Sequence, residues 1–223
     1  RKMRVGVRTV DERTTFYTAL YRCHERMINI SEEGRYFSGF DKQIHDDEGE
    51  PYWTDDWAWD TYHALHPLQI ILNPDDESEK LNSFVRMYRQ SGWVPTFPTV
   101  FGDAHCMNGN HAAAIFADAL CKGIDFDVKG AFEGISHTVM TETMIPWLRG
   151  PKTELDDFYH QNGWFPALHP DEEETVAGVG DFEQRQAVAV SLAASYDDWC
   201  IAQLAKELGK KEEHNFFLQR SFN

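Results

Sequence analysis

The sequence predicts an all-α fold of antiparallel helical hairpins that close into a ring. Two observations carry this prediction. Most of the 223 residues lie in segments whose apolar residues recur at helical spacing. Glycines expected to end helices follow four of these segments, and they lie 31, 40 and 46 residues apart (Gly92, Gly123, Gly163 and Gly209). Solenoid repeats have a regular length, so this uneven spacing favours a toroid whose loops build a pocket on one face.

The first quarter of the chain predicts two helices with an irregular excursion between them. Residues 1–9 are expected to be a linker or an incoming strand, and a capping-box pattern starts a helix over residues 10–27. Residues 30–52 alternate glycines with aromatic residues, which predicts a long loop with a β-hairpin. A second helix is expected from about Asp56, with strain before Pro67 because the residue preceding proline is pushed out of the α region.

The remaining helices follow from caps and stops. Asn73-Pro74 predicts a helix start with a cap and a proline in the first turn, and this helix ends at Gly92. An alanine-rich helix, expected to be buried on several sides, ends near Lys122-Gly123. Further helices are expected over about 127–144, 153–163, 182–208 and 211–222, with an acidic loop over 170–181.

One four-residue pattern occurs twice. Gly92-Trp93-Val94-Pro95 is echoed 71 residues later by Gly163-Trp164-Phe165-Pro166. Each copy follows an amphipathic helix and precedes an irregular segment and another helix. The pattern therefore predicts an internal repeat of helical hairpins.

Composition excludes several classes of partner. The net charge of −16 and a sequence pI of about 4.9 predict repulsion from nucleic acids and from anionic membranes. No apolar run is long enough to span a membrane, and no signal peptide is visible.

The chain opens at Arg1 without an initiator methionine, so we expect it to be cut from a longer protein. The four cysteines form no CxxC pair; we expect buried free thiols, with one disulfide possible in an oxidising compartment.

The most informative stretch is Trp53–Leu68, whose first eight positions hold three tryptophans and three aspartates. A continuous helix from Asp56 would place Asp60, His63 and His66 on one face, with Trp59 beside them. Aromatic faces pack on the C–H face of a sugar and carboxylates accept hydrogen bonds from its hydroxyls, so this cluster predicts a sugar-binding site. The alternatives are core tryptophans with solvated acids, or a zinc site.

Three other polar groups are predicted to be structural rather than ligand-binding. His105 and His111 lie six residues apart, so one helical face cannot present both, and we expect a loop that braces the pocket. Asp197 and Asp198 suggest a calcium clamp, but helical neighbours point apart; we expect one to bond a loop backbone and the other to face water. The acidic run 171–174 is expected to be solvated.

These motifs resemble a known family. Trp59-Asp60-Thr61-Tyr62 followed by His66-Pro67-Leu68 is similar to the W-D-T-[FY]-R-x-x-H-P-L signature of glycoside hydrolase family 92, the calcium-dependent exo-acting α-mannosidases. The resemblance covers residues 13–223 in the right order. It includes the blocks Gly92–Pro95, Gly102–Ala112, Ala117–Ile124 and Ser195–Ala205.

The resemblance implies an (α/α)6 toroid of six helical hairpins, incomplete in this chain, with residues 10–223 as the N-terminal portion of the catalytic domain. It implies hydrolysis of terminal α-mannosides (α-1,2-mannosidase-like) with inversion, assisted by calcium. The family's acid block E-[GA]-N-x-W-Q and base block G-N-D-D-x-G are absent from these residues. They and the calcium ligands are expected downstream of Asn223, so residues 1–223 alone are expected to be inactive.

The expected partners are a mannose-containing glycan, the remainder of the catalytic domain and an N-terminal β-domain, in a periplasmic, cell-surface or secreted protein. Asp60 corresponds to a substrate-binding carboxylate and Trp59 to its neighbour, while His63 stands where the family has Arg. No catalytic residue and no metal ligand is carried over. Ser191–Ala194 replaces a common T-L-E-Y. The alternatives are a non-catalytic glycan-binding or scaffolding module, and a toroid glycosidase of different sugar preference.

Overall fold

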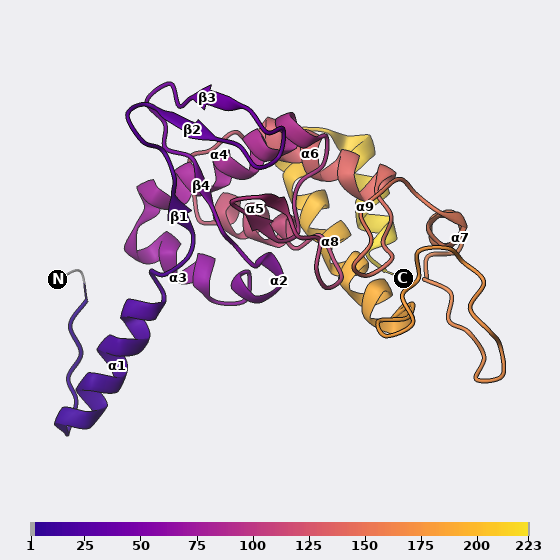
Figure 1. Cartoon of the computed structure of the whole chain (residues 1–223), viewed down its shortest axis with the longest axis horizontal. Coiled ribbons are helices and arrows are strands. Elements are labelled where there is room, and N and C mark those ends of the chain that lie inside the picture. The colour runs from indigo at the N-terminus through magenta and orange to yellow at the C-terminus, as the bar shows by residue number, and fades with distance from the viewer. Residues whose placement is uncertain (1–2, 223) are drawn as a thin grey trace.

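The computed structural model describes residues 3–222, and helices and loops make up most of this part of the chain (Figure 1). The helices are α1 (Val10–Arg22), α2 (Ala58–Thr61), α3 (Leu65–Leu72), α4 (Pro74–Ser91), α5 (Ala112–Cys121), α6 (Val128–Thr141), α7 (Glu154–Asn162), α8 (Ala187–Glu207) and α9 (Lys211–Arg220). The strands are β1 (Ile28–Asn29), β2 (Arg35–Phe37), β3 (Ile44–Asp46), β4 (Trp53–Thr54), β5 (Pro98–Thr99) and β6 (Gly102–Asp103). The prediction of a mainly helical fold is confirmed.

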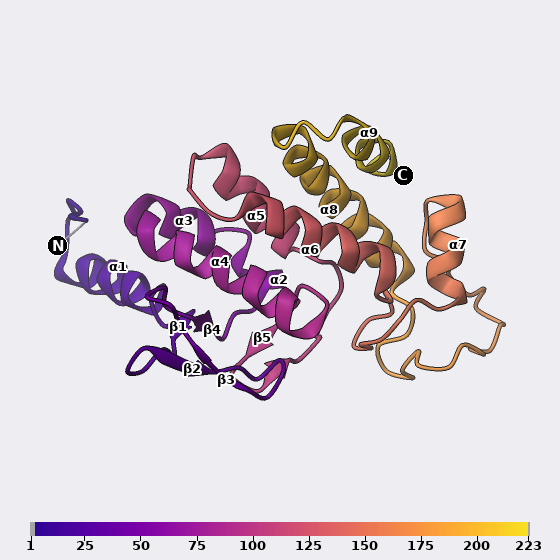
Figure 2. The same cartoon turned by 90° about the horizontal axis from the view of Figure 1, so that it is seen from above.

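The core is built from helical hairpins that pack side by side, as Figure 2 shows for α3–α4, α5–α6 and α8–α9. Helix α5 lies at the centre, in contact with α3, α4, α6 and α8. Its sequence is almost all small or apolar, and Ala112–Ala114 and Ala117 are buried, which allows close approach of its neighbours. The predicted burial of this helix on several sides is confirmed. A smaller apolar cluster joins α7 to the start of α8.

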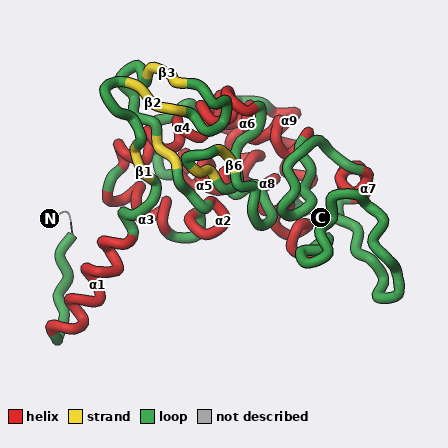
Figure 3. Tube along the Cα trace, in the orientation of Figure 1, coloured by secondary structure: helices red, strands yellow, loops and turns green. Residues whose placement is uncertain are grey.

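The excursion before α2 folds as short antiparallel ladders, which Figure 3 shows as yellow segments within loops. Strands β2 and β3 form the predicted hairpin, and β1 pairs with β4. The guanidinium of Arg86 on α4 donates hydrogen bonds to the carbonyls of Glu50 and Pro51. Gln90, one turn further along α4, accepts from Ser38 and Tyr52. The excursion is therefore fixed against α4 and leads into the Trp/Asp stretch at a defined place.

Two predicted helix boundaries were wrong. The first helix ends at Arg22 instead of residue 27, because Ile28 and Asn29 pair with β4; α1 buries no residue and projects away from the core (Figure 1). The long C-terminal helix starts at Ala187 instead of Phe182. Of the two alternatives given for residues 1–9, a linker or an incoming strand, residues 3–9 form no strand, and residues 1 and 2 lie outside the described part.

The expected continuous helix from Asp56 was also wrong. Helix α2 is a single turn that ends at Thr61, and α3 begins at Leu65. Pro67 lies in the first turn of α3, where its missing N–H deprives the helix of no hydrogen bond. Pro67 is therefore accommodated at the start of a helix, and His66 before it is helical instead of being pushed out of the α region as expected.

The Gly-Trp-x-Pro repeat corresponds to a repeated structure. Gly92 ends α4 with φ of 90° and Gly163 ends α7 with φ of 84°, and each donates its N–H to a tyrosine carbonyl 2.7 Å away, four residues earlier. Two residues after each glycine, the backbone N–H of Val94 donates to the Thr138 hydroxyl and that of Phe165 to the Ser191 hydroxyl, both at 2.8 Å. The motif therefore ends one helix and attaches the segment after it to a later helix, α6 in the first copy and α8 in the second.

Replacing Gly92 by Ala is expected to lower the free energy of unfolding by about 1–2 kcal/mol, because an L-residue resists the left-handed conformation. An added Cβ would meet no atom within 4 Å at Gly92, so the cost is conformational alone. Urea denaturation measures it. Gly150→Ala is the matched control, with the same open surroundings and no left-handed backbone; an equal loss in both variants would contradict the prediction.

Candidate functional site

Helix α2 presents the predicted site residues outward. The inward side of this single turn carries Ala58 and Thr61, which are buried, while Trp59 is 37% exposed and Asp60 is exposed. No described residue hydrogen-bonds to the Asp60 carboxylate. An indole and a free carboxylate therefore lie next to each other on an accessible surface.

The orientation of this turn is set by the buried carboxylate of Asp56. Its Oδ2 accepts a hydrogen bond from the Thr61 hydroxyl at 3.1 Å and lies 3.1 Å from Nε2 of His66. The other ring nitrogen of His66, Nδ1, lies 2.5 Å from Oε1 of Glu77 on α4. The Asp56 N–H donates to the Pro98 carbonyl at 2.9 Å. Asp56 thus stands before α2 and bonds the last residue of this helix, Thr61. Through His66 it also connects the turn to α3 and α4.

Opposite charges offset one another in this buried group. The Asp56 and Glu77 carboxylates lie against His66, and the Lys80 ammonium lies 3.7 Å from Oε2 of Glu77. Burial disfavours the imidazolium, but the Glu77 and Asp56 carboxylates outweigh it and raise the pKa of His66 to about 10. His66 is therefore a structural cation. The expectation that Asp60, His63 and His66 share one face was wrong, because the break after Thr61 turns His66 inward.

Beside α2, a row of rings leads from the surface to the core. The centroid of the His63 ring lies 3.9 Å from that of Tyr62, and Tyr62 lies 4.4 Å from His111 and 6.0 Å from Tyr196. Nδ1 of His111 lies 2.8 Å from Oδ1 of Asp197, whose other oxygen accepts the Asn110 N–H at 2.6 Å. Burial opposes protonation of His111, but Asp197 outweighs it and raises its pKa.

This row shows how the loop before α5 and helix α8 support the site. His111 is the residue before α5 and lies beneath Tyr62, as expected for a bracing loop. Asp197 bonds that loop backbone as predicted. The expectation that Asp198 faces water was wrong, because Asp198 is buried and its Oδ2 accepts from Nε of Arg220 at 3.0 Å.

The other two tryptophans of the stretch already have partners. Nε1 of Trp53 donates to Glu79 at 2.9 Å. The guanidinium of Arg26 lies 3.8 Å from the centroid of Trp57, and its Nη1 bonds Asp55 at 2.9 Å. Trp59 is thus the tryptophan that stands beside the unpaired Asp60.

A second buried charged cluster lies in the loop before α5. His105 Nδ1 is 3.6 Å from both Asp103 and Glu142, and Nη1 of Arg149 is 3.2 Å from Asp103. Asp103 holds this loop through the backbone N–H groups of Phe97 and His105. Both oxygens of Glu142 are buried without a hydrogen-bond partner. Burial raises the pKa of Glu142 to about 7, against the opposing effect of His105 and Arg149.

No metal site forms within residues 3–222. Among these residues, no group of three or more His, Cys, Asp or Glu side chains is placed to hold a metal ion. Asp60 and His63 are exposed whereas His66 is buried, so the three do not combine into the zinc site considered above. No cluster of carboxylates that could supply most of a calcium ion's ligands forms among these residues either, and calcium remains a prediction for other parts of the protein. The four cysteines are free in the structure, and of these Cys200 is buried.

The whole chain, residues 1–223, matches the family model of the glycosyl hydrolase family 92 catalytic domain. The chain belongs to this family. It is 28% identical to an inverting family GH92 mannosidase from Bacteroides thetaiotaomicron VPI-5482, with a TM-score of 0.80 over 99% of this chain and 28% of that one. It is 27% identical to a GH92 α-mannosidase from Bacteroides thetaiotaomicron in complex with mannoimidazole, with a TM-score of 0.77 over 94% and 25% of the two chains.

A curated relative is described as an uncharacterized secreted glycosidase of Arthroderma benhamiae, 26% identical over 140 residues. The alignment covers 61% of this chain and 17% of that protein. This GH92 chain thus spans about a quarter of the length of the solved relatives and less of the curated one. No described helix meets the length and hydropathy needed to cross a bilayer.

The structure leaves each of the predicted site residues Trp59, Asp60 and His63 exposed, and it adds residues that sequence reasoning missed. Tyr62 connects His63 to His111, and Asp56 fixes the turn. The sequence did contain a pattern that could have pointed to Asp56. An acidic residue that stands just before a short turn resembles a helix cap, and Thr61 follows five residues later. The contact of Tyr62 with His111 had none, because 49 residues separate them in the sequence.

His66→Gln is expected to lower the free energy of unfolding by about 3–5 kcal/mol at pH 6.5, because it removes the cation that lies between the buried carboxylates of Asp56 and Glu77. The folded-state pKa of about 10 lies above the ordinary value of about 6.5. The contribution of His66 is therefore complete below about pH 6.5 and is lost as the pH rises to about 10. Urea titrations across this range should show the two proteins converging. His169→Gln, at an exposed histidine, is the control; a pH-independent difference would disprove the linkage.

Glu142→Gln is expected to stabilise the protein at alkaline pH. The folded-state pKa of about 7 lies above the ordinary value of 4.5, so the wild type loses stability as the pH rises through this interval, whereas the amide does not. The variant should match the wild type near pH 4.5 and exceed it above pH 7 by up to about 3 kcal/mol. Thermal and urea unfolding test this, with Glu173→Gln at an exposed position as control. A destabilised variant at pH 8 would contradict the assignment.

Proposed function

We propose that this chain is part of the catalytic domain of an exo-acting α-mannosidase, and that its α2 turn binds the terminal mannose. The observation that supports this most directly is the pair Trp59 and Asp60, held outward on a turn whose inward side is fixed by Asp56. Family membership supplies the reaction class, and both solved relatives are described as mannosidases.

In this proposal the Asp60 carboxylate accepts hydrogen bonds from vicinal hydroxyls of the sugar, while the Trp59 indole packs on its C–H face. His63 is exposed, lies three residues after Asp60 with its ring tilted against that of Tyr62, and contributes a ring N–H to the bound sugar. The network beneath Tyr62 keeps these groups in place before the substrate arrives, so that little free energy is lost in ordering them.

Hydrolysis proceeds with inversion in this proposal, which requires a general acid and a general base on opposite sides of the bond. Neither family block that carries them occurs in these residues, so we assign both, together with the calcium ligands, to other parts of the protein. The helical hairpins described above would form about half of an (α/α)6 ring. We further propose export to the periplasm, the cell surface or the medium; the description of the curated relative as secreted supports this.

Asp60→Ala in the protein that contains the whole catalytic domain is expected to lower kcat/KM for α-mannosides by at least about a hundredfold. Two hydrogen bonds to a charged group are lost, worth about 1.5–3 kcal/mol each, and about 1.4 kcal/mol corresponds to tenfold. Steady-state kinetics on an aryl α-mannoside, with and without EDTA, measures the effect. Asp75→Asn, at an exposed acid in the first turn of α4, is the control. A loss below threefold would remove Asp60 from the site, and sugar binding without hydrolysis by the wild type would indicate a binding module.

A further inference from the structure

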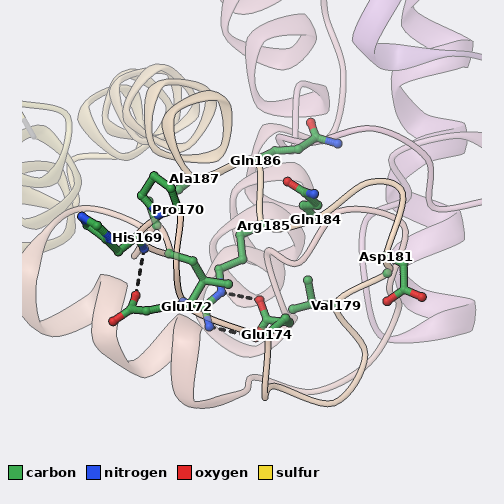
Figure 4. A pocket seen from close by; sticks show the side chains of 13 residues that line it. His169, Pro170, Glu172, Glu174, Val179, Asp181, Gln184, Arg185, Gln186 and Ala187 are labelled. Atoms are coloured by element: carbon green, nitrogen blue, oxygen red, sulfur yellow. Dashed lines mark hydrogen bonds and ion pairs between the residues drawn. The ribbon is translucent and has the colours of Figure 1, made fainter.

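The loop between α7 and α8 encloses a hollow that the site described above does not use (Figure 4). Its volume is about 520 Å³, and two stretches of the loop line it, around Ala167–Glu174 and Val179–Ala187. Small-molecule sites commonly have volumes of this order. The hollow is therefore large enough to hold one or two sugar units.

An ion pair holds the two stretches together. Nε and Nη2 of Arg185 lie 2.6 and 2.8 Å from the two carboxylate oxygens of Glu174, and Nη1 donates to the Pro166 carbonyl at 3.2 Å (Figure 4). The hydrogen bonds from Arg185 lower the pKa of Glu174 to about 2, so both groups stay charged at any physiological pH. The walls of the hollow are thus fixed by a two-point contact rather than by the loop backbone alone.

The lining suits a neutral polyhydroxylated ligand. Apolar surface from Leu168, Pro170 and Val179 alternates with the side chains of Glu172 and Gln184. Carboxylates and amides bond to hydroxyls, and the apolar groups match the C–H faces of a sugar. The lining carries more carboxylates than cations (Glu172, Glu174 and Asp181 against Arg185 and His169), which opposes phosphorylated or carboxylated sugars.

The position of the hollow relates it to the α2 turn. The Gln186 side chain, which lines it, accepts a hydrogen bond at 3.1 Å from Asn108, three residues before His111. Helix α8 starts at this edge, and Tyr196 lies nine residues further on, about 14 Å along the helix axis. The Tyr196 ring is 6.0 Å from that of Tyr62, beside the candidate site. Between them, Val188 and Leu192 are exposed on α8 at four-residue spacing.

We propose that this hollow binds the more distant, leaving-group side of a neutral oligosaccharide whose terminal mannose occupies the α2 turn. The inference rests on the proposed function, because it takes the α2 turn as the place of the terminal mannose. It assigns to the α7–α8 loop a preference for long, uncharged substrates over simple mannosides.

Two variants test the hollow without touching the ion pair. Ala167→Trp fills it from an exposed position, and Gln184→Ala removes one polar group. In the protein with the whole catalytic domain, we expect KM for a neutral mannose oligosaccharide to rise about tenfold in the first variant and about threefold in the second. Kinetics on an aryl α-mannoside should stay unchanged. Ala177→Trp, on the same loop outside the lining, and Gln161→Ala, on α7, are the matched controls.

Equal changes on both substrates, or no change on either, would overturn the proposal. If the wild type hydrolyses no α-mannoside, the proposed function fails separately. The hollow is then tested by calorimetric titration of the neutral oligosaccharide and its phosphorylated counterpart. Weaker binding by Ala167→Trp, with the phosphorylated ligand excluded, would support the hollow as a glycan site, and unchanged binding would reject it.

Discussion

The Asp56 carboxylate is the group on which the candidate site depends. It lies at the end of the β4 segment and contacts the last residue of α2 and the second residue of α3. Because its oxygen is shared by the Thr61 hydroxyl and the His66 imidazole, α2 cannot rotate without breaking a buried, charge-assisted hydrogen bond. A four-residue helix has little stability of its own. The direction in which Trp59 and Asp60 point is therefore a tertiary property, set by a neighbour outside the helix.

A second support reaches the same surface from the opposite direction. Helix α8 brings Asp197 against His111, and His111 lies beneath Tyr62. These contacts require α5 to approach α8 closely, which the buried alanines of α5 permit. Segments separated by up to about 140 residues thus meet around one turn. Both supports pair an imidazole with carboxylate, and in both the carboxylate raises the pKa of the ring, so protonation of either ring strengthens the support beneath this surface.

Local signals predicted several helix ends correctly. The αL glycines at Gly92 and Gly163 and the capping box at Thr9 each act through contacts within a few residues, so the sequence contains them fully. The break between α2 and α3 could not be predicted in this way. The apolar-polar pattern continues through Tyr62–Ala64, and what ends α2 is the buried contact of Asp56 with Thr61 and His66. The same limit explains Asp198, whose partner Arg220 lies on the next helix and not in its own periodicity.

The departure at His63 bears on how Asp60 works. An arginine at this position, as the resemblance leads one to expect, would be a permanent cation three residues after Asp60, able to compete with sugar hydroxyls for a nearby carboxylate. The imidazole instead lies tilted against Tyr62, and Asp60 keeps no partner among the described residues. A carboxylate without a competing cation accepts hydroxyl hydrogen bonds at full strength, and its charge repels anionic sugars. The acidic lining of the hollow at the start of α8 also repels anionic sugars. In the two proposals above, both places favour uncharged glycans for the same electrostatic reason, although no described contact joins them directly.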